Sequence, residues 1–260
     1  MKKWMTFFLV FVLCLTVVEV HAKEHLSEKD VRMFLKERGI IHTEDAQITY
    51  IQIDGEYALR AVEMLEKNRY ESTVTMAYII TEDGQLVRTD IRPMSDISVG
   101  NDDYYDRTGV LVTARMSYSM YSRNYDLYRI AYISPYALSV TISGPNDLSI
   151  PYMEARLAAT AYAYPFPECL NWGTNTDTSQ YIIDGMGYYE LEFTRTNLTP
   201  GLAYGATKFM PDDVILGFSR YGDHDLLVAH IDVETNKGNL IDTEIDFGYP
   251  LNFQELKKKG

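Results

Sequence analysis

Cysteine is scarce in this chain. It has two cysteines among 260 residues, and Cys14 lies in a short apolar segment near the start, so Cys169 is the only one beyond it. Because Cys169 is the only cysteine outside that apolar segment, the rest of the chain cannot form an internal disulfide. Stability must therefore come from a buried core, which a chain of this length can supply. Tryptophan is equally rare, with Trp172 the only one after Trp4.

Basic charge is also in deficit. Lysine and arginine number 24 against 37 acidic residues, a formal net charge of −13. Nucleic-acid binding needs a clustered basic surface, so the charge disfavours a nucleic-acid partner. Anionic polymers and lipid headgroups are repelled as well unless a divalent cation bridges them. We interpret the charge chiefly as a source of solubility.

No apolar run is long enough for a confident membrane span, which needs about 20 residues. The longest, Met5 to Val18, follows Lys2 and Lys3 and precedes Val20-His21-Ala22. This pattern predicts a signal peptide over residues 1–22, cleaved after Ala22, with the mature chain secreted and not stably inserted in a membrane. The mature chain would carry a formal charge of −14. A short signal with little cysteine fits a bacterial protein.

The segment 23–44 shows the only clear helical pattern. Val31, Phe34 and Leu35 recur at helical spacing and Gly39 follows as a stop, which predicts a short helix over about 28 to 38. Past it the hydrophobic period falls to two. Asp54-Gly55 is a hairpin dipeptide, and apolar residues alternate from Val110 to Met120. This part of the chain is therefore predicted to form strands.

Two segments leave helix and strand open, residues 57–69 and residues 152–164. Counting the first as a strand gives seven strands between residues 47 and 143, which is the size of one β-sandwich domain, and we assign that domain to residues 45–143. Gly144-Pro145-Asn146-Asp147 then interrupts the pattern. We therefore predict a mainly β fold with a second sandwich domain over residues 148–250 and a polar tail over residues 251–260.

One motif supports a sandwich architecture. Leu198-Thr199-Pro200-Gly201-Leu202-Ala203-Tyr204 resembles the corner between strands E and F of fibronectin type III domains. The resemblance implies two antiparallel, immunoglobulin-like sandwich domains and a Tyr204 hydroxyl bonded to nearby backbone. Strands are expected after it, at residues 203–209, 214–219 and 225–233.

Cys169 is the candidate nucleophile. A catalytic thiolate needs a histidine within hydrogen-bond reach, and no local signature joins Cys169 to a histidine. We therefore favour an inert thiol. The other candidate is the acidic and histidine group around His224, with His230, Asp232 and Glu234 downstream on one strand face. That spacing suits an exposed face as well as it suits a zinc site.

Acidic and aromatic clusters supply the candidate binding residues. Asn101, Asp103 and Asp106 lie in one acidic loop and offer the oxygen ligands that calcium takes, although they do not match an EF-hand. The chain has 21 tyrosines. Tyr104 and Tyr105, together with Trp172, are the aromatic candidates for contact with a sugar or a protein.

The sequence thus predicts a non-catalytic extracellular binding or interaction module with an unidentified protein or glycan partner. Calcium is its one candidate cofactor. The alternative is a secreted hydrolase that uses Cys169 or the group around His224. A purely structural role in a larger secreted assembly is the third reading.

Overall fold

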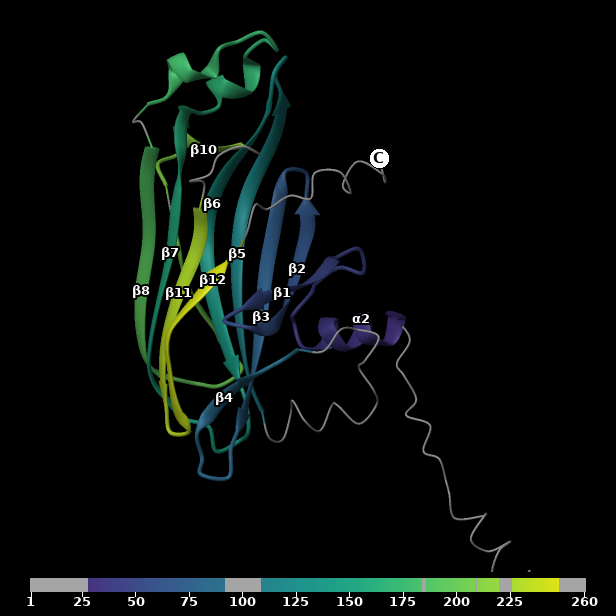
Figure 1. Cartoon of the computed structure of the whole chain (residues 1–260), viewed down its shortest axis with the longest axis vertical. Helices are drawn as coiled ribbons and strands as arrows, with labels where there is room; N and C mark the ends of the chain where they lie inside the picture. Colours follow the sequence, from purple (N-terminus) through teal and green to yellow (C-terminus); the bar gives the residue numbers. More distant parts are fainter. Residues whose placement is uncertain (1–27, 92–108, 184–185, 209, 220–225, 248–260) are drawn as a thin grey trace, which may run out of the picture.

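Antiparallel strands make up nearly all of the regular structure. A computed structural model covers the chain and describes residues 28–91, 109–183, 186–208, 210–219 and 226–247 (Figure 1). Within these ranges there is one α-helix, α2 (Glu28–Glu37), where a short helix was predicted, and two 3₁₀ turns, η4 (Glu168–Asn171) and η5 (Thr178–Tyr181). The mainly β prediction is confirmed. No helix in these ranges is long and apolar enough to cross a membrane.

Twelve strands belong to a single sheet. In chain order they are β1 (Gln47–Ile53), β2 (Glu56–Glu66), β3 (Arg69–Ile80), β4 (Leu86–Thr89), β5 (Gly109–Asn124), β6 (Arg129–Ser143), β7 (Ile150–Pro165), β8 (Met186–Leu198), β9 (Ala203–Thr207), β10 (Val214–Ser219), β11 (Leu226–Thr235) and β12 (Gly238–Asp246). Their order in space is β1-β2-β3-β5-β6-β10-β7-β11-β12, with β4 beside β3, β8 beside β7 and β9 beside β6.

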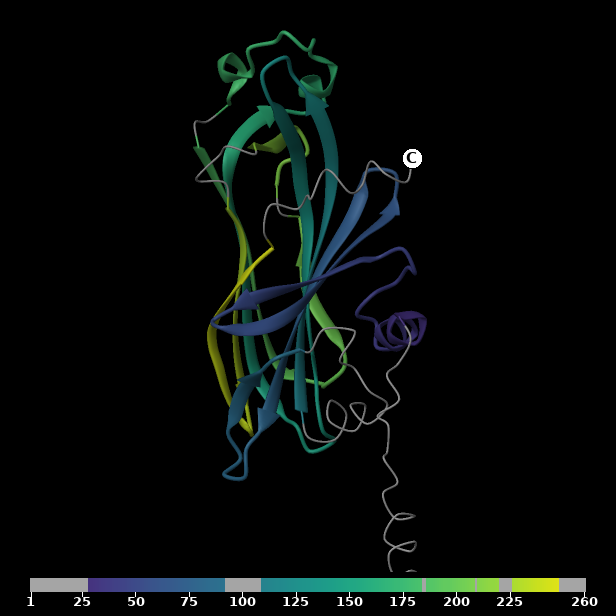
Figure 2. The same ribbon diagram turned by 45° about the vertical axis from the view of Figure 1, so that its right-hand side comes forward.

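The sheet folds back on itself at β10, so that its two halves pack as two layers. β10 pairs with β6 along one edge and with β7 along the other. The first layer contains β1 to β6 and β9, and the second contains β7, β8, β11 and β12; Figure 2 shows them facing each other. One hydrophobic cluster draws residues from both layers, among them Met116 and Val140 from the first and Leu157 and Ile231 from the second. The core is therefore shared by the two halves of the chain.

This arrangement differs from the predicted pair of sandwich domains over 45–143 and 148–250. β9 and β10 come from the later range and pair with β6 in the earlier one. Gly144-Pro145-Asn146-Asp147 forms a tight turn between β6 and β7, where the Leu148 N–H donates to the Pro145 carbonyl at 2.9 Å. A turn and a linker use the same glycine and proline chemistry, so the sequence alone did not separate them.

The two segments left open between helix and strand form strands, with residues 57–66 in β2, a turn at 67–68, Arg69 at the start of β3, and residues 152–164 in β7. The second range lies in β7, where odd-numbered residues from Met153 to Ala163 are buried and even-numbered ones are half-buried or exposed. β5 alternates in the same way, with Met116 and Tyr118 fully buried. Alternating burial with a period of two places one face of each strand in the core and leaves the other available.

A tight turn joins β5 to β6. Ser122-Arg123-Asn124 still belongs to the end of β5. The chain reverses instead over residues 125–128, where the Tyr125 N–H donates to the Tyr128 carbonyl at 2.7 Å. β6 then runs as one strand from Arg129 to Ser143.

The helix α2 covers part of the outer face of the first layer. Leu35 and Ile40 bury their side chains against Leu59 and Ala61 of β2. Gly39 ends the helix with φ +65°, and the Ile40 N–H donates to the Leu35 carbonyl at 2.9 Å. This is the Schellman arrangement, in which glycine takes a left-handed conformation without steric cost. It turns the chain so that residues 38–42 run across the sheet.

The corner at residues 198–204 makes the contact expected of it. The Tyr204 hydroxyl accepts a hydrogen bond from the Thr199 N–H at 2.8 Å. The Gly201 N–H donates to the Ile142 carbonyl of β6, also at 2.8 Å. These two bonds fix the corner against the end of β6.

Candidate functional site

The outer face of β5 and β6 is rich in small hydroxyl side chains. Across the two strands Thr113 lies opposite Thr141, and Arg115 lies opposite Ser139. All four side chains are half-buried, whereas their neighbours along each strand belong to the core. Half-burial without an apolar cover makes this face a candidate contact surface.

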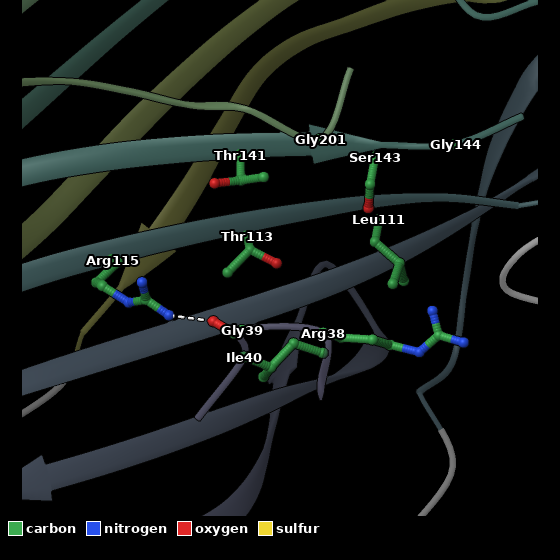
Figure 3. A pocket seen from close by; sticks show the side chains of 10 residues that line it. All are labelled: Arg38, Gly39, Ile40, Leu111, Thr113, Arg115, Thr141, Ser143, Gly144 and Gly201. Atoms are coloured by element: carbon green, nitrogen blue, oxygen red, sulfur yellow. Dashed lines mark hydrogen bonds between the residues drawn. The ribbon is translucent and has the colours of Figure 1, made fainter. Parts of the chain in front are cut away.

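A pocket of about 230 Å³ opens on this face. Its floor is formed by Thr113, Arg115, Thr141 and Ser143, and its walls by residues 38–40 after α2 and by Gly201 of the corner. In Figure 3 Arg115 and Arg38 lie at opposite ends of the pocket, with the hydroxyl side chains between them. We call this the arginine pocket.

Arg115 is held in place by neutral and acidic partners. Its Nε donates to the Thr73 Oγ1 at 3.2 Å and lies 3.4 Å from a carboxylate oxygen of Glu71. Its Nη2 donates to the Gly39 carbonyl, the bond drawn in Figure 3. Nη1 makes no hydrogen bond or ion pair with a described residue, so its N–H groups can donate to a ligand. Because the side chain is fixed, little conformational entropy is lost when it binds one.

The hydroxyls of Thr141 and Ser143 have no hydrogen-bond partner among the described residues, whereas Thr113 shares a hydrogen bond of 3.1 Å with Thr75. The lining contains no carboxylate, histidine, cysteine, lysine or tyrosine from the described part of the chain. General acid–base catalysis uses such a group, and a serine or threonine hydroxyl needs one beside it to act as a nucleophile. The groups that the described lining does offer, guanidinium and hydroxyl, are hydrogen-bonding groups suited to a ligand.

A histidine and two carboxylates lie next to the arginine pocket. Ligand atoms of His42, Glu63 and Glu71 all lie within 4.8 Å of one another, and this is the one such group among the described residues. The Glu63 carboxylate already accepts the N–H groups of His42 and Thr43 at 2.6 to 3.0 Å and the Thr43 hydroxyl at 2.9 Å.

Glu71 of the same cluster lies 3.3 Å from the His42 Nε2 and beside the Arg115 guanidinium. A metal ion would displace the donors on Glu63 and lie close to the positive charge of Arg115. We interpret the cluster as an anchor for the segment after α2.

Cys169 is buried among aromatic side chains. Its exposed fraction is zero, and it belongs to a cluster with Tyr125, Tyr132 and Tyr164 under residues 165–183. Burial raises the pKa of the thiol to about 12. A thiol with that pKa is protonated at neutral pH, whereas a nucleophile must form the thiolate.

Trp172 belongs to the same end of the molecule. Its ring lies 4.6 Å from that of Tyr181 and 6.0 Å from that of Tyr164. Its carbonyl accepts a hydrogen bond from the Arg123 Nη2 at 2.6 Å. These contacts place Trp172 in the packing of residues 165–183 against the sheet.

The other predicted site residues are not brought to the arginine pocket. Tyr104, Tyr105, the calcium candidates Asn101, Asp103 and Asp106, and His224 lie outside the described residues. His230, Asp232 and Glu234 share one face of β11, as predicted. That face is the outer surface of the second layer.

The outer surface of the second layer is acidic. Across the strands His230 lies opposite Arg156, Asp232 opposite Glu154, and Arg156 opposite Glu192. Glu190, Glu234 and Glu244 add to the same surface. Much of the negative charge is therefore gathered on the face opposite the arginine pocket.

Sequence reasoning did not identify the pocket residues. Thr113-Ala114-Arg115 and Ser139-Val140-Thr141 were visible as the polar and apolar halves of alternating strands. The alternation of polar and apolar residues indicates which side chains point away from the core. It does not indicate which strands pair or which segments lie over them. No protein-family model matches the chain, and no curated protein matches it significantly.

Proposed function

We propose that this protein is a non-catalytic binding module of the extracytoplasmic space, and that its binding surface is the outer face of β5 and β6. The arginine pocket takes the carboxylate of a small ligand that also carries hydroxyl groups. The observation that carries the proposal is the lining, which offers guanidinium and hydroxyl groups and no catalytic base in the described residues.

The chemistry of the pocket favours this ligand class. A guanidinium binds a carboxylate through charge-assisted hydrogen bonds, which are about twice as strong as neutral ones. The Thr141 and Ser143 hydroxyls can each donate and accept, which suits sugar-like hydroxyl groups. A sugar acid combines both features.

The net negative charge does not oppose an acidic ligand at this face. The acidic surface of the second layer lies on the other side of the molecule, beyond sheets that pack about 10 Å apart. Charges are screened over about 8 Å at physiological ionic strength. The charged groups of the lining itself are the guanidinium groups of Arg115 and Arg38, and the carboxylate of Glu71 lies beside the Arg115 Nε.

Two sequence expectations belong to the proposal. Export rests on residues 1–22, which lie outside the described residues. The immunoglobulin-like sandwich resemblance rests on the corner at 198–204, and the bond between Tyr204 and Thr199 supports a corner of that kind.

The hydrolase alternative is weaker. A buried thiol with a pKa near 12 is a poor nucleophile at neutral pH. The remaining candidate base of that reading, His224, lies outside the described residues.

Titration calorimetry of residues 23–260 with glucuronate and with glucose tests the proposal. We expect glucuronate to bind about tenfold more tightly than glucose, since one charge-assisted hydrogen bond is worth that much. Arg115→Gln should abolish the difference. Arg69→Gln is the matched control, because Arg69 is exposed and lies away from the pocket on the end of β3.

Arg115→Lys keeps the positive charge, so comparing it with Arg115→Gln separates loss of the charge from loss of folding. Equal affinity for the two sugars, or a preference for glucuronate that survives Arg115→Gln, would contradict the proposal.

A further inference from the structure

A second hollow lies on the same face of the same two strands. It has a volume of about 550 Å³ and is lined by Ser119 and Tyr121 of β5 and by Ser134 and Tyr136 of β6. Phe166 contributes an aromatic wall, its ring 5.6 Å from that of Tyr121. We call this the aromatic pocket.

The position of Tyr136 follows from a β-bulge. The pairing of β5 with β6 passes from Ser117 opposite Ala137 to Tyr118 opposite Pro135, so Tyr136 is an extra residue on β6. A bulge redirects a side chain out of the regular alternation. Tyr136 is 37% exposed, and its backbone carbonyl accepts the Lys208 N–H at 2.9 Å. The backbone that carries the exposed ring is therefore held by Lys208 on the side away from β5.

The two pockets lie in one line. Arg115 and Tyr121 are six residues apart on β5 and point to the same side, a separation of about 20 Å at the rise of a strand. The side chains between them on this face are small, namely Ser117, Ser139 and Ala137. Among the described residues, the stretch of this face from Arg115 to Tyr121 therefore carries no bulky side chain that would obstruct an extended ligand.

We infer that this face binds a linear glycan whose terminal unit is a sugar acid, with the acid in the arginine pocket and a later sugar ring against Tyr136 in the aromatic pocket. Exposed aromatic rings bind the apolar face of a sugar while nearby polar groups hold its hydroxyls. Lys208 and Asp212 line the aromatic pocket and supply those polar groups. The inference rests on the proposed function and deepens it by naming the ligand class.

A glycan fits this face better than a peptide does. Peptides commonly bind a sheet by adding a strand to a free edge. Neither strand has such an edge here, because β5 pairs with β3 and β6 on its two sides and β6 pairs with β5, β9 and β10. The hydroxyl groups that line the face instead match a ligand rich in hydroxyls.

The test measures affinity for a length series of glucuronic-acid-terminated oligosaccharides, starting from glucuronate, with residues 23–260. We expect affinity to rise by about tenfold once the chain spans both pockets, as one aromatic contact of this kind contributes. Tyr136→Ala should remove that gain and leave the affinity for glucuronate unchanged. Tyr188→Ala is the matched control, because Tyr188 is an exposed tyrosine of β8.

The possible outcomes of this test distinguish failure of this inference from failure of the proposed function. Glucuronate binding that depends on Arg115, with no gain from added sugars or no effect of Tyr136→Ala, overturns the inference alone. Failure of glucuronate to bind overturns the proposed function. Binding of extended acidic peptides in preference to the oligosaccharides would also overturn the glycan inference.

Discussion

At the scale of single residues, burial decides which functional groups can reach a ligand and which cannot. Arg115 has one nitrogen without a hydrogen bond to any described residue, while its other two nitrogens are bonded, so it can bind a ligand without moving. Cys169 is the opposite case. It was the most conspicuous single residue in the sequence, and its thiol is fully enclosed.

The buried thiol makes stability depend on alkaline pH. The folded pKa of Cys169 is raised to about 12, above an unfolded value of about 8.5. Its contribution is therefore fully present below the unfolded pKa and is lost as pH rises toward the folded one. Between pH 8.5 and 10 we expect the free energy of unfolding to fall by up to about 1.4 kcal/mol per pH unit.

Urea unfolding at several pH values measures this slope. Cys169→Ala should flatten it over the same pH range, even though the variant is less stable at neutral pH. An unchanged slope in the alanine variant would show that the thiol is not the source. Tyr164, with a pKa also raised by burial to about 12, contributes only at higher pH, because unfolded tyrosine titrates near 10.

At the scale of elements, one buried carboxylate holds the segment that walls the arginine pocket. Glu63 of β2 is 2% exposed and accepts the N–H groups of His42 and Thr43. Glu63→Gln should lower the free energy of unfolding by about 2 to 3 kcal/mol, because an amide cannot accept all of these bonds and hydrogen bonds to a charged group are the stronger ones.

The control for Glu63→Gln is Glu66→Gln on the same strand, where the side chain is 70% exposed. That change should alter stability by less than about 0.5 kcal/mol. Urea unfolding of both variants, with amide exchange of residues 35–46, measures the effect. If the two substitutions cost the same, Glu63 does not anchor this segment.

Elements were predictable from the sequence where the signal is local. Asp54-Gly55 joins β1 to β2 with positive φ at both residues, as the dipeptide predicted. The strand at 214–219 matched β10. The alternation from Leu157 to Ala163 was hard to recognise because the segment is rich in alanine, which has a high helix propensity. Pairing with neighbouring strands determines that this segment is a strand.

The candidate site was far less predictable. The arginine pocket joins residues 38–40 to β5, β6 and the corner at Gly201. Three segments distant in sequence meet there through strand pairing and the path of the chain after α2. Neither pairing partners nor that path leaves a periodic trace in the sequence.

At the scale of the whole molecule, the shared core predicts one cooperative unit. Met76 and Leu157 come from the earlier and the later half of the chain and belong to the same cluster. Either Met76→Ala or Leu157→Ala should lower stability by about 2 to 5 kcal/mol, as large-to-small core changes do. Both should leave a single unfolding transition.

Far-ultraviolet circular dichroism and Trp172 fluorescence, followed in urea, measure that cooperativity. The two signals should coincide in the wild type and in each variant. Two transitions, or a variant that shifts one signal and not the other, would indicate separate domains divided at residues 144–147.

The outer face of β5 and β6 is proposed to bind an acidic glycan. A crystal structure of residues 23–260 with a glucuronic-acid-terminated oligosaccharide tests it most directly. We expect the carboxylate at Arg115, the hydroxyl groups of the terminal sugar near Thr141 and Ser143, and a later sugar ring against Tyr136. A glycan bound on the second layer, at residues 165–183 or nowhere on the protein would contradict it.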